Sequence, residues 1–191
     1  MSQDPAPPWL YEQNGFPTLL DMQRAHARLA RAARPLLHGK KARVIDLGCG
    51  NGALLRLLCE DDPGTVPYGV DREPARIARA RELFPEHAPH FVTGCAFDFE
   101  SWWQDDWTFD LMILTPGRFL EVSAAEGEAL RTRIAGRVSQ VLLYAYSDWL
   151  ERYGDVETMA RLTGFSVTDL SADPMVRGAR VAEGQRAVET R

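Results

Sequence analysis

The stretch Val44-Ile45-Asp46-Leu47-Gly48-Cys49-Gly50-Asn51-Gly52-Ala53 decides the fold of this 191-residue chain. Its first four residues predict a buried strand, its three glycines predict a tight turn, and Ala53 begins a segment with helical spacing of apolar residues. A strand, a glycine turn and a helix in this order let the backbone come close to a ligand, because glycine lacks a side chain.

Strand-like and helix-like segments alternate around this stretch. The strand-like segments are 43–47, 66–70, 90–93, 109–114, 138–146, 165–170 and 179–188, and the helix-like segments are 53–60, 75–84, 124–137 and 156–162. This alternation predicts an α/β, Rossmann-like, doubly wound fold with a mainly parallel seven-stranded sheet and helices on both faces. Ligands bind beyond the carboxyl ends of such strands, so the loops after residues 47, 70, 93 and 114 are expected to form one site.

An amphipathic helix precedes this series. It starts after Thr18, an N-cap residue by type, and Pro35 is expected to interrupt it. The first 17 residues contain four prolines and several aromatic side chains, which favours an irregular segment docked on the domain. We expect residues 1–38 to form a segment and helical lid over the substrate, and residues 39–191 to form the ligand-binding domain.

Composition narrows the class of protein. The hydrophobic fraction of 45% and the charged fraction of 26% are those of a globular protein. A net charge of −5 argues against broad nucleic-acid binding, although residues 24–43 contain seven basic residues and no acid. No apolar run is long enough to cross a bilayer and no secretion signal is evident, so a cytoplasmic location is expected.

Metal binding is not expected. The three cysteines, Cys49, Cys59 and Cys95, lack the CxxC spacing of a zinc site. The four histidines lie outside the expected site loops, so neither a metal site nor a histidine base is predicted.

Two ligands compete for the glycine turn. Gly48, Gly50 and Ala53 satisfy the looser G-x-G-x-x-A fingerprint of nicotinamide and flavin enzymes. However, the carboxylate of Asp46 would repel a pyrophosphate and would accept hydrogen bonds from an ammonium group. S-adenosylmethionine (SAM) carries such an ammonium group and NAD does not.

The motif Asp46-x-Gly48-x-Gly50-x-Gly52 resembles the first motif of the class I SAM-dependent methyltransferases, D/E-x-G-x-G-x-G. The resemblance covers roughly residues 43–115 by motif. It implies that Asp46, Gly48, Cys49 and Gly50 contact SAM, that Thr115 after the fourth strand also contributes, and that S-adenosylhomocysteine is the co-product.

Asp71 ends the next strand, 25 positions after Asp46. The resemblance implies that its carboxylate accepts the two ribose hydroxyls of the cofactor, with Arg72 beside the adenine or in solvent. A carboxylate here is also a good cap for the helix that begins near residue 74, and this alternative stays open.

The third loop departs from the family pattern. Many members carry Gly-Asp-Ala here, whereas this chain has Gly94-Cys95-Ala96-Phe97-Asp98. A thiol is a poor replacement for the carboxylate that accepts the adenine amino group. Asp98 is therefore the candidate acceptor, with Ala96 and Phe97 near the purine, although Phe97 as a core residue is equally plausible.

Candidates for the reaction itself are few, because aligning a nucleophile with an activated methyl group needs little specialised chemistry. The Asn-Pro-Pro-Tyr motif of enzymes that methylate bases is absent after the fourth strand. Arg118 is a candidate for binding an acidic substrate group, and Tyr11 and Tyr146 are candidates for orienting a nucleophile, while a surface arginine and packed tyrosines are the simpler alternatives.

The sequence thus predicts a methyltransferase that uses SAM to methylate an oxygen, nitrogen or sulfur atom of a small molecule. The alternatives are an NAD(P)-dependent oxidoreductase and a SAM-binding module without turnover. Nucleic acid and membrane partners are not expected.

Overall fold

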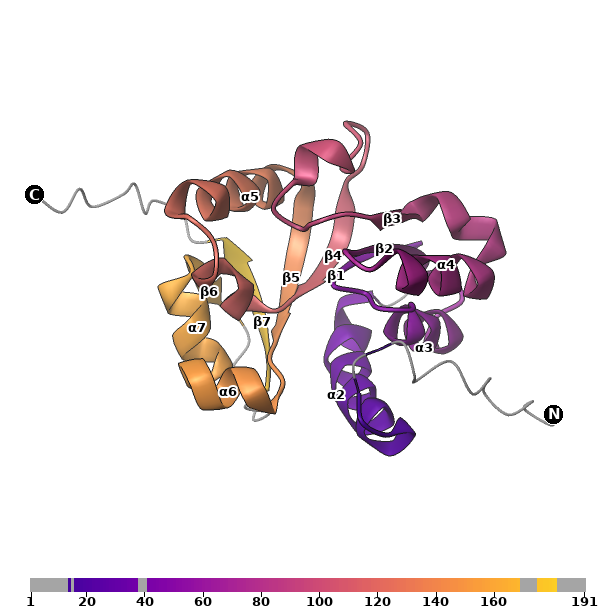
Figure 1. Cartoon of the computed structure of the whole chain (residues 1–191), viewed down its shortest axis with the longest axis horizontal. Helices are drawn as coiled ribbons and strands as arrows, with labels where there is room; N and C mark the ends of the chain where they lie inside the picture. Colours follow the sequence, from indigo (N-terminus) through magenta and orange to yellow (C-terminus); the bar gives the residue numbers. More distant parts are fainter. Residues whose placement is uncertain (1–13, 15, 38–40, 169–174, 182–191) are drawn as a thin grey trace, which may run out of the picture.

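The computed structural model describes residues 14, 16–37, 41–168 and 175–181. Seven strands form one sheet in the order β3-β2-β1-β4-β5-β7-β6 (Figure 1). The strands are β1 (Arg43–Leu47), β2 (Val66–Asp71), β3 (Phe91–Thr93), β4 (Phe109–Leu114), β5 (Val138–Tyr144), β6 (Phe165–Val167) and β7 (Val176–Val181). The helices are α2 (Leu19–Leu37), α3 (Ala53–Asp61), α4 (Pro74–Leu83), α5 (Ala124–Arg137), α6 (Ser147–Tyr153) and α7 (Val156–Leu162).

Strands β1 to β5 are parallel, and β7 runs antiparallel to both of its neighbours, β5 and β6. The predicted mainly parallel, seven-stranded α/β fold is therefore confirmed. Strand order reverses at β1, which pairs with β2 on one side and β4 on the other. Loops that leave adjacent strands in opposite directions open a crevice there, and such crevices bind ligands in α/β proteins.

Successive strand residues point to opposite faces and supply two cores. Val44, Leu111 and Leu142 pack with residues of α2, α3 and α4 in one core. Ile45 and Met112 pack with residues of α5, α6 and α7 in the other. Figure 1 shows α2 and α3 on the opposite side of the central strands from α5. The prediction of helices on both faces is confirmed.

Helix α2 continues through Pro35 to Leu37, so the predicted interruption is wrong. Proline lacks an N–H, so Pro35 removes the hydrogen bond to the carbonyl of Arg31, but the backbone keeps its helical path for two more residues. Burial of Leu37, which is 2% exposed, offsets that loss.

The chain after β5 also differs from expectation. The strand predicted at 138–146 ends at Tyr144, which pairs with Val176 at the beginning of β7. The N–H of Ala145 still donates to the carbonyl of Met175 at 3.1 Å, and the chain then turns. Tyr146 becomes the N-cap of α6, a helix that the sequence did not predict.

The last two strands differ from prediction in part. Strand β6 ends at Val167 rather than 170, and β7 begins at Val176 rather than 179, while the predicted continuation over 182–188 is not tested. Residues 169–174 and 182–191 lie outside the described part of the chain. Three short 3-10 helices, η1 (Pro85–His90), η2 (Phe99–Ser101) and η3 (Pro116–Leu120), were not predicted. Within the described residues, no helix combines the length and apolar character needed to cross a membrane.

Candidate functional site

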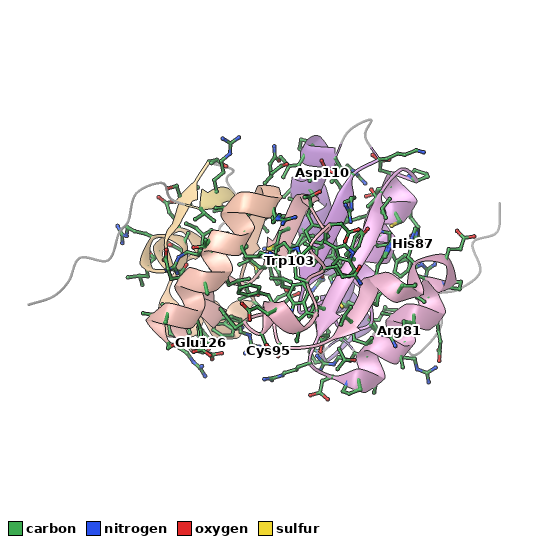
Figure 2. All side chains as sticks on the ribbon, turned by 90° about the horizontal axis from the view of Figure 1, so that it is seen from above. Arg81, His87, Cys95, Trp103, Asp110 and Glu126 are labelled. Carbon is green, nitrogen blue, oxygen red and sulfur yellow. The ribbon has the colours of Figure 1, made fainter. Side chains whose placement is uncertain are left out.

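A cavity of about 890 Å³ lies at the carboxyl ends of the parallel strands. Figure 2 shows Asp110, near the start of β4, and Cys95, just after the end of β3, on opposite sides of the molecule. The cavity lies on the side of Cys95, where the parallel strands end. Residues that follow β1, β2, β3 and β4 all line it. The four loops that the sequence predicted to form one site therefore meet around one cavity.

The glycine loop exposes backbone to this cavity. Gly48 has φ +95°, a left-handed conformation that favours glycine, and an added Cβ would meet no atom within 4 Å. Gly50 has φ +56°, and its N–H donates to Asp71 Oδ2 at 2.9 Å. A Cβ at Gly50 would overlap the side-chain oxygen of Asn14. Gly50 itself does not line the cavity, and it allows Asn14 to pack against the loop.

Asp71 is 6% exposed and ties the loops after β1 and β2 together. Besides the bond from Gly50, its Oδ1 accepts the N–H of Glu73 at 2.9 Å, and Arg76 lies 3.7 Å from Oδ2. The bond from Glu73, which is the N-cap residue of α4, shows that Asp71 also stabilises the start of this helix, as the capping alternative proposed. Each carboxylate oxygen can accept a second hydrogen bond, so Asp71 keeps acceptor capacity toward the cavity that it lines.

Asp46 is the unusual group of the site. Its side chain is 3% exposed, it lines the cavity, and its Oδ1 is buried without a hydrogen-bond partner among the described residues. Burial and the negative charge of Asp71 raise the pKa of Asp46 to about 7. A buried acceptor without a donor is costly, and an ammonium group of a ligand would relieve that cost.

The loop after β3 lines the cavity from Gly94 to Phe97. Phe97 also packs edge-on against Phe119 at 5.0 Å, so it is both a cavity residue and part of the core's border. Asp98 does not line the cavity; it begins η2, and its carbonyl accepts the Ser101 hydroxyl at 2.7 Å. The exposed Cys95 lies nearer to the cavity than the predicted acceptor.

The loop after β4 brings Thr115 and Arg118 to the cavity. Thr115 is the N-cap residue of η3 and is 8% exposed. The Arg118 guanidinium lies 4.8 Å from the centre of the Trp149 ring and donates to Glu121 at 3.0 Å. Arg118 is therefore held at the cavity wall by an aromatic ring and a carboxylate.

Two tyrosines, Tyr144 and Tyr146, line the cavity. Tyr144 is buried, and the side chains of Thr115 and Tyr146 interact with its hydroxyl. Burial and the charge of Asp46 raise the pKa of Tyr144, which keeps it protonated. Tyr146 lines the cavity as predicted for a candidate catalytic residue, whereas Tyr11 lies outside the described residues.

The N-terminal part of the chain supplies cavity residues that sequence reasoning missed. Asn14 Oδ1 accepts the N–H of Asn51 at 3.0 Å. Phe16 contacts the rings of His26 and Tyr146 edge-on, with ring centres 5.4 and 5.2 Å apart. These residues are isolated in sequence and carry no motif, so only their position in the fold marks them.

His26 contradicts the expectation that the histidines lie away from the site. It lines the cavity from α2 and is 6% exposed, and burial lowers its pKa to about 4, so it is neutral near pH 7. Arg24 and Arg28 line the cavity from the same helix. Within the described residues, no group of three or more His, Cys, Asp or Glu side chains is arranged to hold a metal ion.

Comparison with known proteins identifies relatives. A family model for a methyltransferase domain matches residues 38–142, more than half of the chain. The release factor glutamine methyltransferase of Rhodospirillum rubrum is 31% identical over 124 residues, which cover 59% of this chain and 35% of that protein. A trans-aconitate 2-methyltransferase of Acidovorax ebreus is 37% identical over 67 residues, covering 33% and 26%. The chain thus spans about a third of the length of these relatives.

Solved structures share the fold. The magnesium protoporphyrin IX methyltransferase of Synechocystis PCC 6803, solved with bound SAM, superposes with a TM-score of 0.54 at 16% identity, over 93% of this chain and 86% of that one. The resemblance to class I SAM-dependent methyltransferases is confirmed. Because the matched segment runs from the glycine loop through the strands that build the cavity, this chain belongs to the methyltransferase-domain family.

Proposed function

We propose that the protein transfers a methyl group from SAM to an oxygen, nitrogen or sulfur nucleophile of a small molecule, releasing S-adenosylhomocysteine. The observation that carries this proposal is Asp46, a buried carboxylate that lines the cavity and has an oxygen without a donor among the described residues. An ammonium group satisfies such an oxygen, whereas the pyrophosphate of NAD would be repelled by it.

The residues around the cavity fit SAM. Asp46 would hold the ammonium end, and Asp71 would accept the ribose hydroxyls with its remaining acceptor capacity. The backbone of Gly48 and Cys49 would lie against the ligand, and Arg72, Ala96 and Phe97 would border the adenine. A role for Asp98 at the adenine lacks support, because this residue does not line the cavity.

When bound, SAM supplies an electrophilic methyl group. The task of the chain is then to align the acceptor and to exclude water. Phe16, Tyr146 and Trp149 line the cavity and offer apolar surface for both purposes. Tyr144 and Thr115 also line the cavity, and their hydroxyls would orient a polar acceptor.

Helix α2 is proposed as a cover over the acceptor, in keeping with a division of the chain at residue 38. Five of its residues line the cavity, namely Asp21, Arg24, Ala25, His26 and Arg28, while Leu29, Ala33 and Leu37 pack in the core. The cover is thus anchored at one end by the domain itself.

A small-molecule acceptor is favoured over nucleic acid by the net charge of −5. One of the relatives is named as a methyltransferase of a release factor glutamine and the other as a methyltransferase of trans-aconitate. The two names thus refer to a protein acceptor and to a small-molecule acceptor. We also propose a cytoplasmic location, which the three free cysteines support because disulfides are rare in reducing compartments.

Calorimetric titration with SAM, S-adenosylhomocysteine and NADH tests the proposal. We expect saturable binding of the first two ligands and none of NADH. Binding of NADH alone would favour the oxidoreductase, and SAM binding without turnover on a broad acceptor panel would favour a binding module.

The pH dependence of binding gives a second test. The ammonium group binds the ionised form of Asp46, so affinity for S-adenosylhomocysteine should fall as pH drops from 7.5 to 5.5. The loss should approach about tenfold per pH unit well below pH 7, where Asp46 is protonated in the free protein. The Asp46→Asn variant should bind more weakly at pH 7.5 and lose this pH dependence.

A further inference from the structure

The cavity is lined by groups of both charges. Asp46 and Asp71 lie where the loops after β1 and β2 meet, and we call this part the cofactor end. Asp21, Arg24, Ala25, His26 and Arg28 line the cavity from α2, and we call these five residues the α2 rim. The cofactor contacts proposed above do not use the α2 rim.

The two arginines of the α2 rim lie one helical turn apart, four positions from each other, and so share a face of α2. The guanidinium of Arg28 donates to the sulfur of Met175 at 2.8 Å, and Met175 lines the cavity too. Arg24 forms no ion pair with any residue that the structure describes. Both arginines therefore line the cavity from one face of α2.

Acidic residues near the α2 rim are already engaged. The carboxylate of Asp21 accepts the Thr18 hydroxyl at 2.6 Å at the start of α2. Glu121 accepts from Arg118 at 3.0 Å and from Arg152 at 3.4 Å. Neither acid forms an ion pair with Arg24, so neither of these carboxylates neutralises the positive charge of Arg24.

His26 points to a polar ligand at the same place. It is more than nine-tenths buried, it lines the cavity, and its ring nitrogens have no hydrogen bond to any described residue. Its contact with Phe16 is through the ring edge and face rather than through a hydrogen bond. A polar group of a ligand in the cavity could form a hydrogen bond with this imidazole.

We propose that Arg24 and Arg28 bind a carboxylate of the methyl acceptor, so that the acceptors are small organic acids. Arginine binds a carboxylate through two parallel hydrogen bonds, and two neighbouring arginines strengthen this recognition. A monoanion fits better than a phosphate dianion, because Asp21 and Glu121 also line the cavity. Asp46 and Asp71 disfavour an anion at the cofactor end, which directs the carboxylate to the α2 rim. This inference rests on the proposed function.

Calorimetry on the full chain saturated with S-adenosylhomocysteine tests the proposal without requiring turnover. The probes are matched pairs of a carboxylate and its neutral amide: benzoate and benzamide, cinnamate and cinnamamide, hexanoate and hexanamide. We expect at least one carboxylate to bind roughly tenfold more tightly than its amide, as for a charge-assisted hydrogen bond.

Variants assign this preference to the α2 rim. Arg24→Gln and Arg28→Gln should each reduce the preference by about threefold or more. Arg31→Gln is the matched control, because Arg31 is exposed on the same helix and does not line the cavity. It should leave the preference unchanged, and circular dichroism should confirm that all three variants are folded.

The outcomes separate this proposal from the proposed function. If S-adenosylhomocysteine does not bind, both are overturned. If it binds but no carboxylate is preferred, or if the preference survives both arginine substitutions, only the acceptor site is overturned. If Arg24→Gln or Arg28→Gln weakens S-adenosylhomocysteine itself by more than about threefold, the arginines hold the cofactor's own carboxylate and the proposal is wrong.

Discussion

The cofactor end and the α2 rim differ in how the chain builds them. At the cofactor end, Asp46 and Asp71 lie near the carboxyl ends of the paired strands β1 and β2, and the N–H of Gly50 donates to the Asp71 carboxylate. At the α2 rim, His26 meets Phe16 from the same segment, but Tyr146 and Met175 come from the far end of the sequence. A site made by adjacent strand ends has a local sequence signature, and a site assembled from distant segments does not.

The two ends also respond to burial in opposite ways. Burial raises the pKa of Asp46 to about 7 and lowers the pKa of His26 to about 4, because it disfavours the charged form of each group. Ionisation of either group should therefore destabilise the fold, at high pH for Asp46 and at low pH for His26. Substitutions of these residues test this contrast through the pH dependence of stability.

The largest effect is expected for Asp46→Asn. The folded protein holds the Asp46 proton more tightly than the unfolded chain, so wild-type stability should fall as pH rises from about 4 to 7. At pH 8 the variant should be more stable by up to about 4 kcal/mol, at 1.36 kcal/mol per pKa unit, and near pH 4 it should differ little. Urea unfolding at both pH values measures this, and a gain that does not depend on pH would contradict it.

His26→Gln should behave in the opposite sense. The unfolded chain binds a proton at this position more readily than the folded protein, so wild-type stability should fall as pH drops from 6.5 toward 4. The variant should lack this part of the acid sensitivity, by up to about 3 kcal/mol in the free energy of unfolding. His87→Gln serves as the control at a histidine outside the cavity. Equal acid sensitivity in all three proteins would remove the contrast between the two ends.

Asp71→Ala tests the cofactor end through binding. It should weaken S-adenosylhomocysteine by about 1–3 kcal/mol, because the ribose hydroxyls lose a buried charged acceptor. Adenosine shares the ribose and should weaken by the same factor in calorimetry. Glu82→Gln, which removes an exposed ion pair with Arg79 on α4, is the control and should leave both affinities unchanged. Unaltered binding by Asp71→Ala would rule out the assigned role.

The smallest effect is expected where α2 leaves the cavity. Arg34 pairs with Asp61 at 2.8 Å and its side chain is 59% exposed, so solvent screens the interaction. Arg34→Gln should change the free energy of unfolding by no more than about 0.5 kcal/mol and should not alter S-adenosylhomocysteine affinity. A change in affinity would mean that the whole of α2, and not only its rim, is coupled to the cofactor end.

Sequence reasoning succeeded for elements with strong local patterns and failed where partners were distant. The glycine loop and the seven strands follow from runs of apolar residues and from turn residues. The end of β5 could not be predicted, because Tyr144 and Tyr146 have the same strand propensity and only the start of β7 decides where pairing stops. Helix α2 passes Pro35 for a similar reason: the burial of Leu37 depends on the tertiary core.

The sequence by itself determined the α/β alternation, the strand-glycine-helix motif and its two carboxylates, Asp46 and Asp71, because each is encoded by neighbouring residues. Only the tertiary structure decided that Asp46 is buried with an oxygen lacking a donor among the described residues, that Asp98 stays outside the cavity, and that α2 contributes His26 and two arginines to its rim. Burial and charge at a cavity depend on segments that meet only after folding, so no local pattern can specify them.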